Sequence, residues 1–454
     1  MAEVEAVNER AGAWGRGQAS VRRVLSATVL VGAFFGLDKI VALVRQRVIA
    51  QFFGLNPVLD AYNTANNLPD LLFALISGGA LAMAFIPILS EVLGREGRVA
   101  AWRLFSMVTN LAFLITAAAA VVVALVPLFL VQRVVAPGFS LEQQLLVADL
   151  MRLNLIATLL FSVSGLVMGA LQAHQHFLLP ALAPLLYNVG QIVGVSLLGP
   201  RFGIHGLVYG VILGAALHLL IQAPGLARYG FRWTPRISLS DPQVRRVLRL
   251  MGPRVLTVAL LYLVFIINDN LASGLGPGAV TALAYGWLIM QVPETVIGTA
   301  AGTALLPTLA EMVSRGERTE LRRLLRRAVA VLVALTVPIT LAALVLLRPA
   351  VKLLFEGRAF TAENSELVIL AARMFMLGLM GHSLVDVAAR TFYAHKDART
   401  PLLLAGVTLA LYLVLARVLV GASLGFAGLA LANAIAFSVE AALMLVILAR
   451  RRIL

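Results

Sequence analysis

The sequence of 454 residues contains no cysteine and few charged residues. Without cysteine the chain can form neither disulfide bonds nor thiolate metal sites, although this absence does not indicate a compartment. Charged residues make up 13% of the chain and hydrophobic residues 60%, against about 25% and roughly 45–50% in soluble globular proteins. This balance excludes a soluble globular domain and indicates a membrane protein.

The common motifs of phosphate chemistry and hydrolysis are also missing, because the sequence contains no Walker loop, nucleophile elbow or HExxH pattern. Their absence argues against an ATP-driven pump and against a membrane hydrolase. We therefore expect no catalytic residues and no cofactor, with an ion gradient or the membrane potential as the energy source. His174, His176 and His395 lack a second ligand set at metal spacing, so we expect no metal site.

Long apolar runs without period-two alternation dominate the sequence. Backbone polar groups in hydrocarbon must be satisfied within one element, so such runs predict helices, each spanning the membrane with about 20 residues. The sequence predicts an all-α polytopic membrane protein with about twelve transmembrane helices. The expected spans are 23–52, 58–93, 99–132, 142–173, 177–199, 204–226, 243–273, 278–314, 319–354, 363–394, 399–420 and 424–450.

The net charge of +15 does not indicate a nucleic-acid partner, because the basic residues lie in short clusters between apolar segments. These clusters occur in alternate connections, whereas the loops 54–57 and 274–278 carry no Lys or Arg. By the positive-inside rule this alternation places both termini in the cytoplasm. The clusters are Arg10 to Arg23, Arg95 to Arg103, Arg228 to Arg249, Arg315 to Arg327, Lys396 with Arg399, and Arg450 to Arg452.

Sequence elements recur at an offset of about 221 residues. Gln172-Ala173-His174 matches Tyr393-Ala394-His395, and Arg152 matches Arg373, at this offset. The recurrence predicts two six-helix parallel repeats around a central cavity, an architecture that suits alternating access. The expected domains are a cytoplasmic tail (1–22), an N-lobe with helices one to six (23–227), a cytoplasmic linker (228–242) and a C-lobe with helices seven to twelve (243–454).

Several segments resemble one family over most of the chain. VRQRVIAQFFGLNPVLDAYNTANNLPDLL, QAHQHFLLPALAPLLYN, FEGRAFTAEN and FYAHKDARTP are similar to the MurJ (MviN) lipid II flippases of the multidrug/oligosaccharidyl-lipid/polysaccharide (MOP) exporter superfamily. The resemblance implies a transporter that moves an undecaprenyl-pyrophosphate-linked peptidoglycan precursor across the bacterial inner membrane. Its partners would be this anionic lipid-linked substrate and the bilayer, and we expect a monomer.

The resemblance also implies a cationic cavity, because Arg or Lys in a low-dielectric cleft attracts a pyrophosphate. The basic positions of the family's first helix fall on Lys39 and Arg45, with Arg47 a little beyond. At about 100° per residue, Lys39 and Arg45 do not share one narrow stripe, and Arg45 could instead snorkel to the interface. Where the family carries arginine in its second and eighth helices, this sequence has Phe73-Ala74 and Trp287-Leu288.

Four acidic or amide side chains are further candidates for substrate binding or coupling. Asp60 lies at the start of the second helix, where it either contacts substrate or complements the helix dipole. Asn268 and Asp269 end the seventh helix and either bind a cation or sugar hydroxyls or form a solvated helix end. Asp386 is buried by pattern, so it is a candidate proton or ion carrier.

Three functions compete. The first is a lipid II flippase, with another lipid-linked oligosaccharide or polysaccharide as a related substrate. The second is an ion-coupled drug exporter of the same superfamily, which should show carboxylates in its cavity. The third is a membrane assembly partner that transports nothing, which the intact repeat disfavours. The basic residues Lys39 and Arg45 favour the flippase.

Overall fold

The computed structural model describes residues 34, 36–76 and 79–454. The predicted tail 1–22 and the first part of the first span lie outside the described residues. Within these ranges the chain is helical, and its single β contact is an isolated bridge between Gly357 and Phe360. The prediction of an all-α protein is confirmed, as expected when apolar runs leave the backbone no partner outside its own helix.

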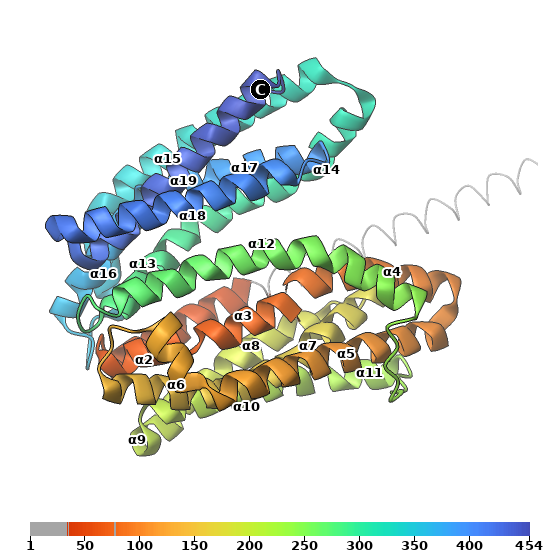
Figure 1. The fold of residues 1–454 in the computed structure, drawn as a ribbon, viewed down its shortest axis with the longest axis horizontal. Coiled ribbons are helices and arrows are strands. Elements are labelled where there is room, and N and C mark those ends of the chain that lie inside the picture. Colours follow the sequence, from red (N-terminus) through yellow and green to blue (C-terminus); the bar gives the residue numbers. More distant parts are fainter. Residues whose placement is uncertain (1–33, 35, 77–78) are drawn as a thin grey trace, which may run out of the picture. The chain divides into compact units, whose positions relative to one another are not determined.

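The helices follow the predicted spans within a few residues (Figure 1). Several predicted spans are broken into shorter helices, often at a π-helical turn or a proline. The chain forms a helix over 36–53, α2 (Pro57–Ala65), α3 (Asn67–Ile76), α4 (Gly79–Arg95), α5 (Gly97–Leu125), α6 (Pro127–Leu130), η1 (Val131–Val135), α7 (Leu141–Ala173), α8 (Leu178–Val193), η2 (Gly194–Leu198), α9 (Gly199–Phe202), α10 (Ile204–Leu220), α11 (Ala223–Arg228), α12 (Pro242–Ala272), α13 (Ala279–Glu294), η3 (Thr295–Thr299), α14 (Ala300–Arg315), α15 (Arg318–Phe355), α16 (Ala362–Met376), α17 (Leu379–Ala394), α18 (Arg399–Leu419), η4 (Val420–Leu424) and α19 (Gly425–Arg450).

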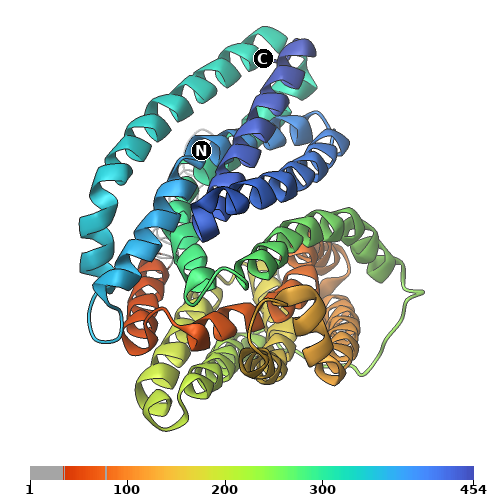
Figure 2. The ribbon, with the colours of Figure 1, turned by 60° about the vertical axis from the view of Figure 1, so that its left-hand side comes forward.

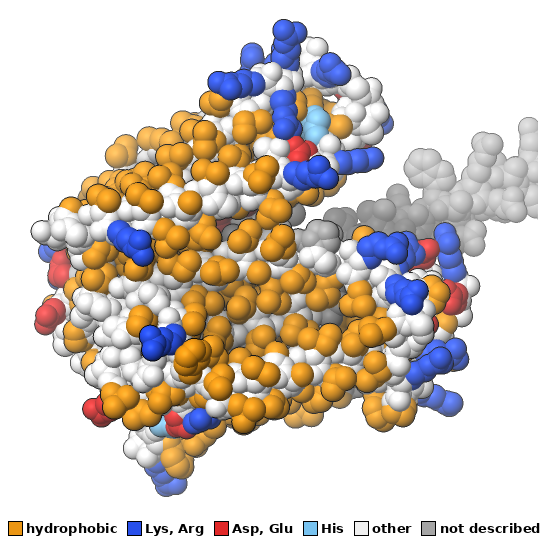
Figure 3. Space-filling model, viewed as in Figure 1, with side chains coloured by type: hydrophobic (Ala, Val, Ile, Leu, Met, Phe, Trp, Pro, Cys, Tyr) orange, Lys and Arg blue, Asp and Glu red, His pale blue; other side chains and the backbone are white. Residues whose placement is uncertain are grey.

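Seven helical stretches of the described chain are long and apolar enough to cross a membrane, and the pair α16 and α17, bent by 44°, is an eighth. The stretch Arg399–Arg450 holds two predicted spans, because Ser423 and Gly425 adopt positive φ between α18 and α19. Figure 3 shows hydrophobic side chains over the sides of the helices and Lys and Arg gathered near their ends. This distribution is that of a multi-pass membrane protein.

The predicted repeat is visible in the backbone. The first residues of α7, α8 and α10 precede those of α16, α18 and α19 by 221 residues. The ring N–H of His174 donates to the carbonyl of Ala170, and that of His395 to the carbonyl of Thr391, both over 2.8 Å. Gln175 and Lys396, which follow these histidines, have φ of 59° and 60°. The duplicated sequence therefore builds the same turn twice.

The first of two compact units contains the described residues up to Val48 together with Pro69–Ala124 and Arg152–Val255. Its core joins α4, α5, α7 and α12 around Phe85, Trp102 and Leu166. Against α8 and η2, α10 packs backbone to backbone. A Cβ on Gly190 would lie 2.4 Å from the Cα of Gly214, so the close approach requires glycine.

The second unit contains Ile49–Leu68, Leu125–Met151 and Leu256–Leu454. Tyr285, Phe355 and Phe360 form the centre of one of its hydrophobic clusters. The helices α18 and α19 lie side by side, and α19 also packs on α17 (Figures 1 and 2). This unit brings the segments 49–68 and 125–151 into contact with helices that follow residue 256, and so it positions the acidic residues described below.

Candidate functional site

Arg45 belongs to a polar cluster in the first unit. Its Nη1 donates to the side-chain oxygen of Asn188 over 2.9 Å, and the Asn188 amide nitrogen donates to a carboxylate oxygen of Asp38 over 2.8 Å. Asp38 and Arg45 are seven residues apart, about two helical turns, so both face α8. An amide both donates and accepts, which lets Asn188 bridge a cation and an anion.

The guanidinium of Arg45 is incompletely satisfied. Its Nη2 reaches Gln46 over 3.5 Å, a long contact, and its Nε is buried without a hydrogen-bond partner among the described residues. A buried donor without an acceptor costs about 1–3 kcal/mol. Lys39 and Arg47 are exposed on the same helix. Of the three predicted basic residues, Arg45 is therefore the one with an unused buried donor.

Asp60 lies fully buried in the second unit. Its carboxylate accepts hydrogen bonds from the backbone N–H of Gly278 (2.6 Å), the backbone N–H of Thr281 (2.8 Å) and the Thr281 hydroxyl (2.6 Å). These donors belong to the N-terminus of α13, where an anion is favoured. The helix α2, which contains Asp60, is capped by Asn56 instead. Asp60 thus caps a helix that lies more than 200 residues away in the sequence.

Asn268 and Asp269 also bond to other helices of this unit. Asp269 accepts from the Asn67 amide over 2.8 Å and contacts the Thr64 hydroxyl at 3.4 Å. Asn268 accepts from the Tyr412 hydroxyl over 3.0 Å. A cavity of about 230 Å³ lies nearby, and it is lined by Asp60, Gly138, Phe139, Gln143, Ser273, Gly274, Gly276 and Pro277.

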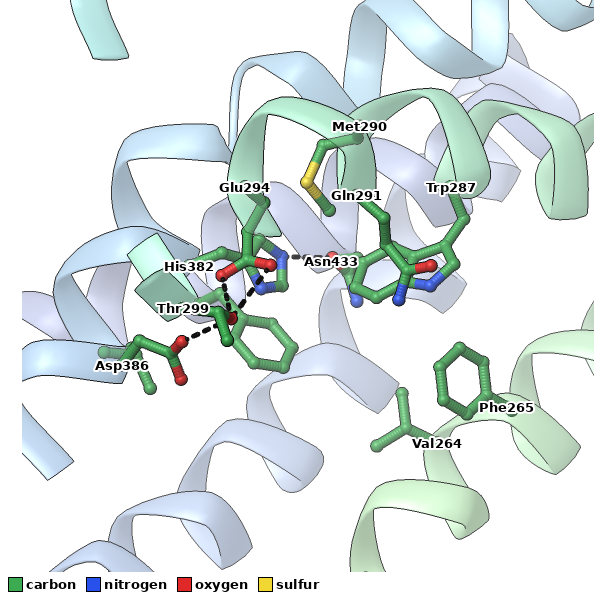
Figure 4. A pocket seen from close by; sticks show the side chains of 12 residues that line it. Val264, Phe265, Trp287, Met290, Gln291, Glu294, Thr299, His382, Asp386 and Asn433 are labelled. Carbon is green, nitrogen blue, oxygen red and sulfur yellow. Dashed lines mark hydrogen bonds between the residues drawn. The ribbon is translucent and has the colours of Figure 1, made fainter. Parts of the chain in front are cut away.

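Asp386 lines a second cavity of the second unit, with a volume of about 260 Å³ (Figure 4). The hydroxyl of Thr299 lies 2.7 Å from Asp386 Oδ2 and 3.1 Å from Glu294 Oε1. Two carboxylates therefore meet at one hydroxyl. The cavity is lined by Val264, Phe265, Trp287, Met290, Gln291, Glu294, Thr299, His382, Val385, Asp386, Asn433 and Phe437.

Two further side chains set the charge and shape of this cavity. Arg390 lies one turn after Asp386, and its Nη1 is 3.0 Å from Asp386 Oδ1. His382 stacks on Phe437, with ring centroids 4.0 Å apart, and its Nε2 lies 3.0 Å from the side-chain oxygen of Asn433. Asp386 was predicted from the sequence as a coupling residue, whereas Glu294 and Arg390 were not. A carboxylate inside a long apolar run is costly, and this signal could have identified Glu294.

Two perturbed groups lie in the turns outside the spans. The hydrogen bond from the Thr400 hydroxyl, together with Arg451 at 2.6 Å, holds the pKa of Asp397 well below its usual range. Burial and the Arg228 guanidinium lower the pKa of His176. His176 and Asp397 follow the two equivalent turns after His174 and His395. These turns therefore have the same backbone conformation but differ in charge.

Comparison with known proteins identifies the family. The family described as lipid II flippase MurJ matches residues 49–454. The lipid II flippase MurJ of Burkholderia cenocepacia is 32% identical over 388 residues, which cover 84% of this chain and 75% of that protein. The probable lipid II flippase MurJ of Rhizobium meliloti is 31% identical over 434 residues, covering 91% and 78%.

Solved structures agree in fold. A lipid II flippase MurJ in an inward closed conformation has a TM-score of 0.80 at 22% identity, covering 93% of this chain and 87% of that one. An inward-facing multidrug resistance MATE family transporter of the MOP superfamily has a TM-score of 0.77 at 15% identity, covering 90% and 94%. Sequence match and hydrophobic helices together show that this chain is a multi-pass bacterial inner-membrane protein that belongs to the MurJ lipid II flippase family.

Proposed function

We propose that this chain is a lipid II flippase, which moves the undecaprenyl-pyrophosphate-linked peptidoglycan precursor from the cytoplasmic to the outer leaflet by alternating access. The observation that supports this substrate best is the buried Nε of Arg45, which has no hydrogen-bond partner among the described residues. An anionic oxygen would satisfy that donor, and a charge-assisted hydrogen bond to it is worth about 1.5–3 kcal/mol. The Arg45 guanidinium would thus hold a pyrophosphate oxygen.

The other basic residues of the first helix have a supporting role in this proposal. Lys39 and Arg47 are exposed on the helix that carries Arg45. Both would raise the local concentration of an anionic headgroup through long-range attraction. Asn188 would keep Arg45 oriented, since it is anchored in turn by Asp38.

Asp60, Asn268 and Asp269 were named as substrate-binding candidates, and their protein partners suggest a more specific role. Asp60 joins α2 to α13, and Asp269 on α12 binds Asn67 and Thr64. We propose that these bonds hold one end of the transporter closed, and that substrate passage breaks them. The Asp60 bonds are the strongest of the set, because the carboxylate lies at a helix N-terminus.

The orientation and assembly of the chain complete the proposal. Both termini would lie in the cytoplasm, because the basic clusters occupy alternate connections. The lobes 23–227 and 243–454 would move against each other, with 228–242 as their linker. The chain would act as a monomer, with Asp386 as the group through which an ion or proton couples to transport.

One observation favours a second candidate function. An ion-coupled drug exporter needs carboxylates in an apolar cavity, and Glu294 and Asp386 face a cavity with walls of Phe265 and Trp287. Aromatic faces and a carboxylate suit an organic cation. A cationic dye is therefore the appropriate competing substrate in any transport assay of this chain.

The deciding experiment is reconstitution into vesicles with fluorescently labelled lipid II, followed by measurement of outer-leaflet exposure. The proposal expects exposure to exceed that of protein-free vesicles, and to fall in Arg45→Ala at unchanged protein content. Efflux of a cationic dye without any lipid II exposure would support the drug exporter and refute the flippase. Depletion in cells should accordingly accumulate the precursor in the inner leaflet.

A further inference from the structure

The 260 Å³ cavity of the second unit contains two carboxyl groups that meet at the Thr299 hydroxyl, and one of the two contacts lacks a hydrogen unless a proton is added. We propose that Glu294 and Asp386 form a site for one proton, and that loading and unloading of this site couples a proton gradient to transport. The coupling to transport rests on the proposed flippase function, whereas the proton site does not. The existence of the proton site is testable without any transported substrate.

The first line of evidence is a count of hydrogens. The Thr299 hydroxyl lies 2.7 Å from Asp386, a usual O–H···O hydrogen-bond distance, and 3.1 Å from Glu294, a slightly longer contact. A hydroxyl has one hydrogen to donate, and an ionised carboxylate only accepts. Thr299 can thus donate to one carboxylate, and the other contact lacks a hydrogen. A proton on that second carboxyl completes the chain, because the carboxyl O–H then donates to the Thr299 oxygen.

The second line is a count of charges. Arg390 forms an ion pair with Asp386 at 3.0 Å. Among the described residues this leaves one negative charge without a cation when Glu294 is ionised. Uncompensated charge is costly within a membrane segment, and the cluster lies on α13 and α17 among apolar neighbours. One proton makes the set of Glu294, Asp386 and Arg390 neutral. Both counts therefore give the same number of protons.

The local backbone is shaped for this pair. Glu294 and Thr299 are five residues apart, a spacing that lies on opposite sides of an α-helix but on one side of a π-helical turn. The turn η3 (Thr295–Thr299) supplies that geometry. A Cβ on Gly298 would lie 2.8 Å from Glu294 Oε1, and one on Gly302 would lie 2.5 Å from Arg390 Nη1. These two glycines leave room for the carboxylate and for the guanidinium.

Other titratable groups surround the pair. On α17 these are His382, whose Nε2 is engaged with Asn433, and Tyr393, which lies near Arg390, Asp386 and Glu440. The buried Glu440 is on α19, and α14 contributes Thr303, whose hydroxyl is 3.4 Å from Arg390. Arg390 is the cation that the structure pairs with the carboxyl cluster. A single replacement at Glu294 or Asp386 therefore leaves one carboxylate opposite one guanidinium.

The chemical step is a proton transfer with solvent. On loading, an O–H bond forms at one carboxylate oxygen of the pair as a hydronium ion becomes water, and no other covalent bond changes. On unloading, the proton returns to water on the other side of the membrane. The Thr299 hydroxyl keeps its own hydrogen at the end of each event, so it links the two carboxyls without being consumed.

The site itself is tested by infrared difference spectroscopy of the full chain in lipid, because a protonated carboxyl has a C=O band that a carboxylate lacks. Wild type at neutral pH should show one protonated carboxyl that both Glu294→Gln and Asp386→Asn lose. The control Glu363→Gln, at an exposed position of α16, should keep it. Arg390→Gln removes the cation and should increase the band about twofold.

Retention of the band in either single amide variant would overturn the proton site. So would a band that disappears when NaCl replaces choline chloride at constant pH, since that result would assign the site to sodium. Because wild type and variants share His382, Tyr393 and Glu440, the difference spectra isolate the pair from these groups.

Coupling is tested in the lipid II vesicles by imposing a proton gradient. The gradient should accelerate exposure in wild type and in Glu363→Gln, and it should have no effect in Glu294→Gln. A gradient effect of equal size in Glu294→Gln would overturn the coupling even if the infrared band were present. Absence of lipid II exposure under every condition, with the band intact, would instead refute the flippase and leave the proton site standing.

Discussion

The side chains of Asp60 and Thr281 form a 2.6 Å hydrogen bond across a sequence separation of 221 residues. The start of a helix in the first repeat thus caps the start of a helix in the second. Since a carboxylate at a helix N-terminus is favoured by the dipole and by the unpaired N–H groups, this contact stabilises the packing of α2 on α13.

Replacement of Asp60 should loosen this contact. Asp60→Asn keeps the size of the side chain but removes its charge, and loss of a capping interaction costs about 0.5–2 kcal/mol. We expect the variant to open this end of the transporter more often and to expose lipid II more slowly. Because the chain has no cysteine, Pro277→Cys in the nearby cavity reports opening by its rate of thiol labelling. Labelling that is no faster with Asp60→Asn than without it would contradict a closing role, and Glu142→Gln serves as control.

Replacement of Arg45 by lysine should distinguish the effect of its positive charge from the effect of the several N–H donors of its guanidinium. Arg45→Lys keeps one positive charge but removes the Nε donor and the bond to Asn188. Loss of a charge-assisted hydrogen bond worth about 1.5–3 kcal/mol predicts lipid II exposure that is roughly tenfold to a hundredfold slower. Vesicle exposure rates, normalised to protein content, measure the effect. Arg98→Ala is the control, and a wild-type rate in Arg45→Lys would remove the guanidinium from the site.

The ion pair between Asp397 and Arg451 should give pH-dependent stability. The folded pKa of Asp397 is lowered, so its contribution is present above the unfolded value of about 4 and is lost as the pH falls through the lower folded value. Asp397→Asn should therefore reduce the melting temperature at neutral pH, and the difference from wild type should shrink below about pH 4. Thermal unfolding in detergent measures it. Arg451 is partly exposed, so the effect is modest, about 1 kcal/mol or less.

The contact between α8, η2 and α10 should not tolerate a methyl group. A Cβ on Gly194 would lie 2.4 Å from the Cα of Gly210, and overpacking of this kind costs about 1–3 kcal/mol. Gly194→Ala should thus lower the melting temperature and the amount of folded protein in the membrane. Gly406→Ala is the matched control, since no atom of the described residues lies within 4 Å of a Cβ built at Gly406. Equal stability of the two variants would contradict tight packing here.

The helices were predictable because their cause is local. Apolar length alone placed spans such as 142–173 and 319–354 within a residue or two of α7 and α15. The breaks were less visible, since a π-helical turn such as η3 depends on what the inserted residue packs against. The span 278–314 was accordingly predicted as one helix, and it contains α13, η3 and α14.

The contacts of the site were harder to predict because they depend on distant partners. The sequence positions of Glu294 and Asp386 do not predict that the Thr299 hydroxyl lies between their carboxylates. The partner of Arg45 was equally hidden, because an amide such as Asn188 has no signature among polar residues near helix ends. Arg45 became a candidate through the resemblance to the family, and Asp386 through its place in an apolar run, where a charge is costly.

The glycine contacts of α8 and α10 also limit how the first unit can move. Helices that pack through side chains can slide slightly against each other as the rotamers of those side chains change. At the contact of Gly190 with Gly214, the two backbones meet directly without side chains between them. We therefore expect α8 and α10 to move together as a rigid body. Any relative movement of helices during a transport cycle must therefore occur at other helix–helix contacts, where side chains lie between the two backbones.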